Sequence, residues 1–185
     1  MKEMLFVILF GISLSSTAQK IESDKGLGKE RHISTSLISV VDEKTDTPWG
    51  FYLTGGYSSN YIMEEMDDSL VFFLNIIIRA NDIIEFPEKP IILYKLFDDL
   101  SFVGRASYTS SVKNKTQYNN CVVLALFDST LRMFNRGLKK IRVETTEGYE
   151  EIEFTEDEVG NLIYDSFHNI VDRFKEKKKH VLDDF

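Results

Sequence analysis

The run Leu70–Ile78 (LVFFLNIII) constrains the fold of this chain more than any other segment. Its residues are aliphatic, β-branched or aromatic, with Asn75 as the single polar member. These residue types favour strands, and a run without polar alternation is typical of a strand that is buried on both faces. The segment therefore predicts a sheet with other parts of the chain packed on both of its faces.

Shorter runs of the same character predict further strands, separated by polar turns. Turns are expected at Asp42–Pro48, at Asp98-Asp99 and at Glu147-Gly148, and the polar stretch Ser110–Asn120 is expected to be a long exposed loop. The predicted strands are Ile33–Val41, Trp49–Thr54, Ile91–Phe97, Ser101–Thr109, Cys121–Phe127, Ile141–Thr145 and Tyr149–Phe154.

Two helices are expected in the second half of the chain. Asp128-Ser129 can cap a short helix near 129–136, which Gly137 would end. An amphipathic helix is expected near 156–180, where Thr155 and Glu158 have capping-box spacing. Its apolar residues recur every three or four positions and form one stripe: Val159, Leu162, Ile163, Phe167, Ile170, Val171 and Phe174.

These elements predict an α+β, strand-rich fold. We expect a mostly antiparallel sheet, curved or folded into a sandwich, with the C-terminal helix packed across it. Residues 33–185 are expected to form a single domain, and residues 19–32, which lack periodicity, a flexible N-terminal arm.

The first 18 residues have the pattern of a cleavable signal peptide. Lys2 precedes the apolar run Leu5–Leu14, and small residues at 16–18 precede Gln19. The apolar run is shorter than the roughly 20 residues that span a bilayer. The sequence thus predicts a secreted or periplasmic protein without a membrane span in the mature chain.

Charge and cysteine content limit the partners. The net charge of −8 makes nucleic acid an unfavourable partner. Cys121 is the single cysteine, so it forms no intrachain disulfide and no cysteine-based zinc site, and its apolar neighbours indicate a buried position. No cofactor or metal site is predicted, because the acidic run at 64–68 lacks the spacing of a calcium loop.

The aromatic segment around Gly55-Gly56 offers a candidate ligand site. Exposed rings on a β-scaffold can stack on sugars, whereas aromatic residues on alternating strand positions also build cores. The candidate ligand-binding residues are Trp49, Tyr52, Tyr57 and Tyr61.

Catalytic patterns are weaker. His168 lies within one helical turn of Asp165 and Asp172, which is also the spacing of an ordinary solvated helix flank. No nucleophile elbow or phosphate loop is present, so no catalytic residue is predicted.

From Lys89 onward, a strand, a capped helix, the segment Gly137–Thr145 (GLKKIRVET) and a terminal amphipathic helix follow one another. This order resembles a group of small exported bacterial proteins of unknown function, over roughly residues 89–175. The resemblance implies no catalytic residues. In its strand, Arg142 and Glu144 share one face, and Ile141, Val143 and Thr145 share the other.

The sequence therefore favours an exported, non-catalytic accessory or binding domain with an unknown protein or glycan partner. Two alternatives stay open: a secreted glycan-binding module that uses the aromatic residues at 49–61, and a small hydrolase without a recognisable motif.

Overall fold

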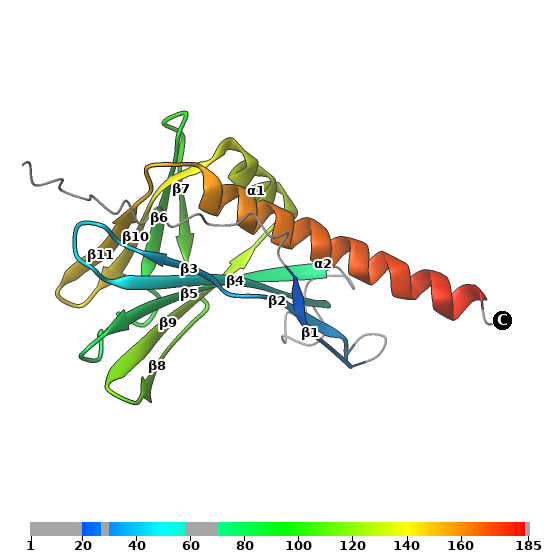
Figure 1. The fold of residues 1–185 in the computed structure, drawn as a ribbon, viewed down its shortest axis with the longest axis horizontal. Coiled ribbons are helices and arrows are strands. Elements are labelled where there is room, and N and C mark those ends of the chain that lie inside the picture. Colours follow the sequence, from blue (N-terminus) through cyan, green and yellow to red (C-terminus); the bar gives the residue numbers. More distant parts are fainter. Residues whose placement is uncertain (1–19, 27–29, 58–69, 184–185) are drawn as a thin grey trace, which may run out of the picture.

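The computed structural model describes residues 20–26, 30–57 and 70–183, with side chains as far as Glu176. These residues form two antiparallel sheets, two α-helices and a 3-10 turn (Figure 1). The α+β class predicted from the sequence is confirmed.

The larger sheet contains seven strands among the described residues, in the order β1-β2-β4-β5-β9-β8, and β3 also pairs with β4. Its members are β1 (Ile21–Lys25), β2 (His32–Thr35), β3 (Ile38–Val41), β4 (Pro48–Tyr57), β5 (Leu70–Ala80), β8 (Tyr108–Asn114) and β9 (Gln117–Leu126).

The smaller sheet has the order β11-β10-β6-β7. Its strands are β6 (Ile91–Leu96), β7 (Ser101–Arg105), β10 (Leu138–Thr145) and β11 (Gly148–Glu153). The helical elements are α1 (Asp128–Met133), the 3-10 turn η3 (Phe134–Arg136) and α2 (Glu158–Asp183).

The predicted strand at Leu70–Ile78 is confirmed as β5, which lies between β4 and β9. Residues 71–76 of β5 are buried on both faces of the sheet. The run of apolar side chains thus has the environment that its composition requires.

One continuous core joins the two sheets and α2. Leu124 of β9 packs closely against Gly104 of β7. A Cβ at position 104 would lie 2.9 Å from Cδ1 of Leu124. A Cβ at Gly55 of β4 would lie 2.6 Å from Ile170 Cγ2 of α2. Small residues therefore let the sheets and the helix approach each other.

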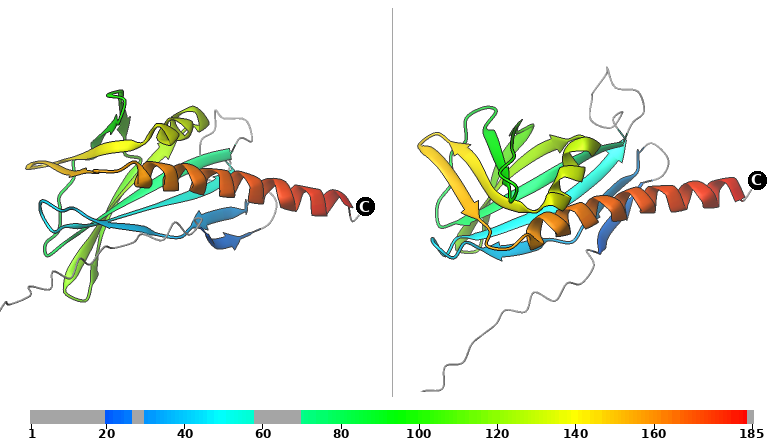
Figure 2. Two further views of the ribbon diagram at one scale, coloured as in Figure 1. Left: turned by 45° about the horizontal axis from the view of Figure 1, so that its top comes forward. Right: turned by 90° about the horizontal axis from the view of Figure 1, so that it is seen from above.

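Helix α2 lies across the core with its predicted stripe inward, and its C-terminal end extends beyond the sheets (Figures 1 and 2). Phe167 is 1% exposed and meets Phe72 edge to face at 5.0 Å. Among the described residues, no helix combines the length and apolar character that a membrane crossing requires.

The predicted loop at Ser110–Asn120 is wrong. These residues belong to the hairpin of β8 and β9, which turns at Lys115 and Thr116. Strand β8 is polar because it lies at the edge of the sheet and exposes much of its length. The expected strand Ser101–Thr109 is also divided, since β7 and β8 belong to different sheets.

Two other expectations need correction. Residues 21–25, predicted to be part of a flexible arm, form β1 and pair with β2. Neither helix has the predicted side-chain cap: α2 begins at Glu158, three residues after Thr155, and the N-cap residue of α1 is Phe127. The predicted stop at Gly137 is confirmed by its φ of 78°. The predicted signal peptide, residues 1–18, lies outside the described residues.

Candidate functional site

The outer face of the four-stranded sheet carries the candidate site. On β6, Tyr94 is buried, whereas Leu93 and Lys95 lie on the other side of the strand. On β10, Ile141 and Val143 are buried and Arg142 points away from them. Strand alternation therefore directs the charged residues of both strands to one outer face.

Strand register arranges these charges in cross-strand rows. Lys95 of β6 lies directly opposite Lys140 of β10, and Glu153 of β11 lies on the other side of Lys140. In the next row, Leu93 and Glu151 flank Arg142. Two like charges directly opposite each other are unfavourable in a sheet. The Lys95–Lys140 pair therefore requires anions nearby.

An irregularity in β10 adds another lysine to this face. The pairing of β10 with β6 shifts register between Leu138 and Lys140, so Lys139 is an extra residue in a β-bulge. Leu138 and Ile141 are both buried, and the two lysines between them are both half-buried outside the core. Bulges re-aim side chains in this way. We call Lys95, Lys139, Lys140 and Arg142 the basic cluster.

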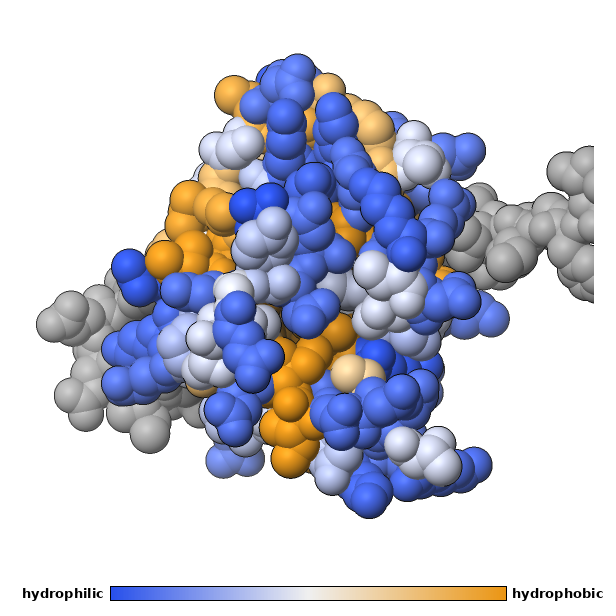
Figure 3. All heavy atoms as spheres, turned by 90° about the vertical axis from the view of Figure 1, so that its left-hand side faces the viewer, coloured by the Kyte–Doolittle hydropathy of each residue, from blue (hydrophilic) through white to orange (hydrophobic). Residues whose placement is uncertain are grey.

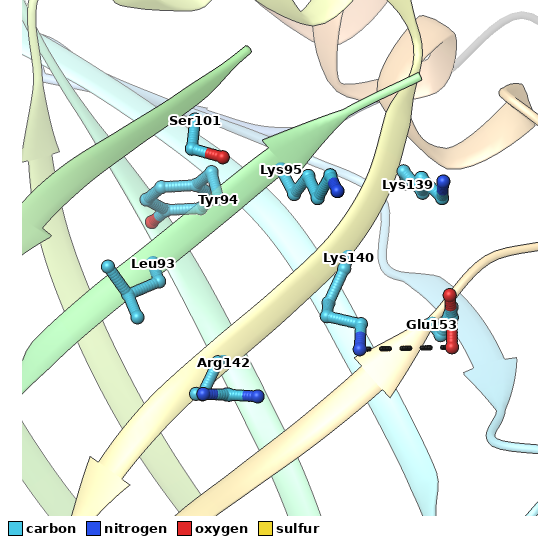
Figure 4. A pocket seen from close by; sticks show the side chains of 8 residues that line it. All are labelled: Leu93, Tyr94, Lys95, Ser101, Lys139, Lys140, Arg142 and Glu153. Carbon is cyan, nitrogen blue, oxygen red and sulfur yellow. Dashed lines mark ion pairs between the residues drawn. The ribbon is translucent and has the colours of Figure 1, made fainter. Parts of the chain in front are cut away.

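The basic cluster lines a concavity of about 420 Å³. Figure 4 shows its cationic side chains coming from β6 and β10, with Glu153 of β11 facing Lys140. The ring of Tyr94 belongs to the core, where it stacks on Phe102 with the centroids 4.8 Å apart. The complete lining consists of Leu93, Tyr94, Lys95, Ser101, Lys139, Lys140, Arg142 and Glu153.

Carboxylates partly neutralise the basic cluster. Glu151 accepts hydrogen bonds from Arg142 Nη2 at 2.8 Å and from Lys140 Nζ at 3.1 Å. Lys44, from the turn between β3 and β4, lies 2.7 Å from Glu153. Asp99 lies 2.9 Å from Lys95.

Ion pairs on this face thus join five cations to three carboxylates among the described residues. Within these ion pairs the cations outnumber the carboxylates by two, on a chain whose net charge is −8.

The ion pairs keep these carboxylates charged. Burial favours a higher pKa for Glu151, but hydrogen bonds from Arg142 and Lys140 outweigh it, and the pKa lies below the ordinary value. Hydrogen bonds from Lys44 and from Lys95 lower the pKa values of Glu153 and Asp99, respectively. The face therefore has the chemistry of anion recognition, since ammonium and guanidinium groups bind oxyanions by charge-assisted hydrogen bonds.

The structure does not unite the aromatic residues predicted to bind a ligand. Trp49 is 2% exposed and packs inside the core against Phe51, so it cannot stack on a sugar. Tyr52 lies on the opposite face of β4 from Trp49, and Tyr57 packs edge to face on Phe174. Tyr61 lies outside the described residues. The described members form no shared platform.

Two other residues considered in the sequence, His168 and Cys121, do not line the basic concavity. His168 packs between Tyr164 and Phe167, and its Nε2 has no hydrogen-bond partner among the described residues. Burial raises the pKa of Cys121 to about 11, which keeps the thiol protonated and unreactive near neutral pH. No cluster of His, Cys, Asp and Glu in the described parts of the chain can hold a metal ion, and the acidic run at 64–68 lies outside them.

A second concavity, of about 390 Å³, lies between residues 83–85 and the turn that joins β10 to β11. It contains Glu147 and Glu150, and burial raises the pKa of Glu150. Figure 3, which faces the left-hand side of Figure 1, shows a mostly hydrophilic surface with separate apolar patches. Its acidic lining offers no cation that would attract a negatively charged ligand.

Fold and site together define a two-sheet α+β domain with a basic concavity on its smaller sheet. Comparisons of the chain with protein-family models, with curated proteins and with solved structures find no match.

Sequence reasoning missed this site, although it placed Arg142 and Glu144 on one face of a strand. The GLKKIRVET segment contained the signal, in two adjacent lysines within an otherwise alternating strand. The pairing partner on β6 and the position of the bulge depend on contacts between distant segments, which a local pattern does not contain.

Proposed function

We propose that this chain is an exported, non-catalytic binding domain that holds an anionic partner on the outer face of its four-stranded sheet. The observation that carries the proposal is the convergence of Lys95, Lys139, Lys140 and Arg142 on one concavity of an acidic chain. Clustered charge of one sign in a concave surface concentrates ligands of the opposite sign.

A binding role fits the chemistry of the face better than a catalytic role. Carboxylates that act as general acids or bases near neutral pH need raised pKa values, whereas the pKa values of Glu151, Glu153 and Asp99 are lowered. Such groups orient cations and stay ionised. The signal-peptide pattern of residues 1–18 supports export to the periplasm or the medium, and mass spectrometry should find Gln19 as the first residue of the native protein.

Binding can be tested with the mature chain, residues 19–185, and immobilised poly-L-glutamate, with dextran as the neutral polymer. We expect saturable binding to poly-L-glutamate that weakens as salt increases, and none to dextran. The triple variant Lys95→Gln, Lys140→Gln, Arg142→Gln should bind at least tenfold more weakly.

The control is a triple variant with the same loss of charge elsewhere: Lys113→Gln, Arg132→Gln, Lys175→Gln. These side chains are exposed and lie on β8, α1 and α2. If both triple variants lose binding equally, attraction is a property of overall charge and the proposed surface is wrong.

A further inference from the structure

Two lysines from different strands share one carboxylate oxygen. Asp99 Oδ1 lies 2.9 Å from Lys95 Nζ and 4.0 Å from Lys139 Nζ. The first distance is that of a hydrogen bond, and the second is too long for one. Lys139 has no shorter ion pair among the described residues. Its ammonium group is therefore held less tightly than that of Lys95.

Asp99 belongs to the turn between β6 and β7, whereas the other carboxylates of this face belong to a strand. Its φ of 65° places it in the left-handed region, and its side chain is 73% exposed. Glu151 accepts hydrogen bonds from both Arg142 and Lys140 within the sheet. Of these two carboxylates, that of Asp99 is the more easily displaced, because exposed ion pairs contribute little to stability.

We infer that Lys95 and Lys139 form an oxyanion-binding site. In the free chain, the Asp99 carboxylate occupies the position at which the oxyanion of the ligand binds. This inference rests on the proposed function, since it names the group of the anionic partner that the basic face recognises. The ligand group is a sulfate, a phosphate or a carboxylate. Asp99 lies close to the two lysines in the free chain and competes with that group.

The surroundings favour a doubly charged oxyanion. The two ammonium groups that pair with Asp99 carry two positive charges, whereas Lys140, opposite Lys95 in the sheet, is paired with Glu151 and Glu153 (Figure 4). Two ammonium groups around one position are matched better by two negative charges on the ligand than by one, because each ammonium group donates its own charge-assisted hydrogen bonds. Sulfate and the phosphate dianion should therefore bind more tightly than acetate.

The variant Asp99→Asn tests the competition. Asparagine has the same shape, and it tolerates the left-handed region as well as aspartate does, so the turn should keep its conformation. Sodium sulfate, phosphate and acetate are titrated into the mature chain at constant ionic strength, and NMR follows the ammonium signals of its lysines. In the wild-type chain, the signals of Lys95 and Lys139 should shift saturably with sulfate.

Removal of the competing carboxylate should tighten sulfate binding roughly two- to fivefold, which corresponds to the free energy of an exposed ion pair. Asp128→Asn is the matched control, because Asp128 forms an exposed pair with Arg132 at the same i,i+4 spacing, on α1. It should leave sulfate affinity unchanged. If both variants tighten binding equally, or if Asp99→Asn weakens binding, the inference is overturned.

Lys139→Gln separates this inference from the proposed function. Loss of sulfate binding in this variant supports the oxyanion site. The inference fails and the proposed function stands if sulfate shifts no lysine signal, while poly-L-glutamate still binds and the triple variant Lys95→Gln, Lys140→Gln, Arg142→Gln weakens that binding. If neither probe binds, both fail.

Discussion

Arg31 holds Asp24 through two hydrogen bonds, from Nε and from Nη2, each 2.8 Å long. Arg31 also donates to the carbonyl oxygen of Arg173 and lies over the ring of Phe174, both on α2. This buried pair thus connects the hairpin of β1 and β2 to the C-terminal helix.

Arg31→Ala should reduce the free energy of unfolding by about 3 kcal/mol, because it leaves a largely buried carboxylate without its main partner. Arg173→Ala, which removes a more exposed contact to the same carboxylate, should cost less than 1 kcal/mol. Urea denaturation of both variants measures the difference. Equal losses would show that burial of the pair has no energetic role.

Phe167→Ala should reduce the free energy of unfolding by about 3–5 kcal/mol, because this ring of α2 is fully buried against Phe72 of β5. Thr155→Ala should change the free energy of unfolding by less than about 0.5 kcal/mol, since α2 begins only at Glu158. The same denaturation assay compares them. A neutral Phe167→Ala would contradict the packing of α2 against the sheets.

Gly137→Ala should destabilise the chain by more than 1 kcal/mol. Its φ is 78°, and a Cβ would lie 2.5 Å from Cβ of Asp157. Gly148→Ala is the matched control, because its φ of 145° is also positive but a Cβ there has no atom within 4 Å. Thermal melts should show the larger decrease for Gly137→Ala, and a larger decrease for Gly148→Ala would contradict the close approach at Gly137.

The stability of the chain in acid should depend on Glu151 and Glu150 in opposite directions. The folded-state pKa of Glu151 is lowered, so its contribution is present above the ordinary glutamate pKa and is lost as the pH falls through the folded value. Burial raises the pKa of Glu150, so protonation of that residue stabilises the fold.

Below the ordinary glutamate pKa, Glu151→Gln should therefore lose stability less steeply than the wild-type chain as the pH falls. Glu150→Gln should differ from the wild-type chain at higher pH, where it lacks the stabilisation that protonation of Glu150 provides as the pH falls toward the ordinary value. Urea melts at several pH values provide the slopes. If both substitutions change the slope in the same direction, the ion pairs of Glu151 do not control its titration.

The sequence predicted elements whose determinants are local. The apolar run at Leu70–Ile78 and the stripe on α2 each reveal their environment through spacing, and both predictions are confirmed. The turn at Asp98-Asp99 also lies where its residues predict.

Predictions failed where position in the sheet decides the structure. Strand β8 is polar because an edge strand need not bury its side chains, and its sequence therefore resembles a loop. The aromatic residues at 49–57 alternate in and out of the core, which explains why Trp49 is buried and Tyr52 lies on the other face. The candidate site depends on the cross-strand pairing of Lys95 with Lys140 and on a bulge at Lys139. Only the pairing of β6 with β10 defines these two features.

A lysine footprint tests the central claim most directly. A chain of residues 19–185 is acetylated briefly with and without saturating poly-L-glutamate, and mass spectrometry measures the modification of each lysine. Binding on the outer face of the four-stranded sheet predicts at least threefold protection of Lys95, Lys139 and Lys140, with unchanged modification of Lys113 and Lys115 on the β8–β9 hairpin. Equal protection of both groups, or protection of the β8–β9 lysines alone, would contradict the account.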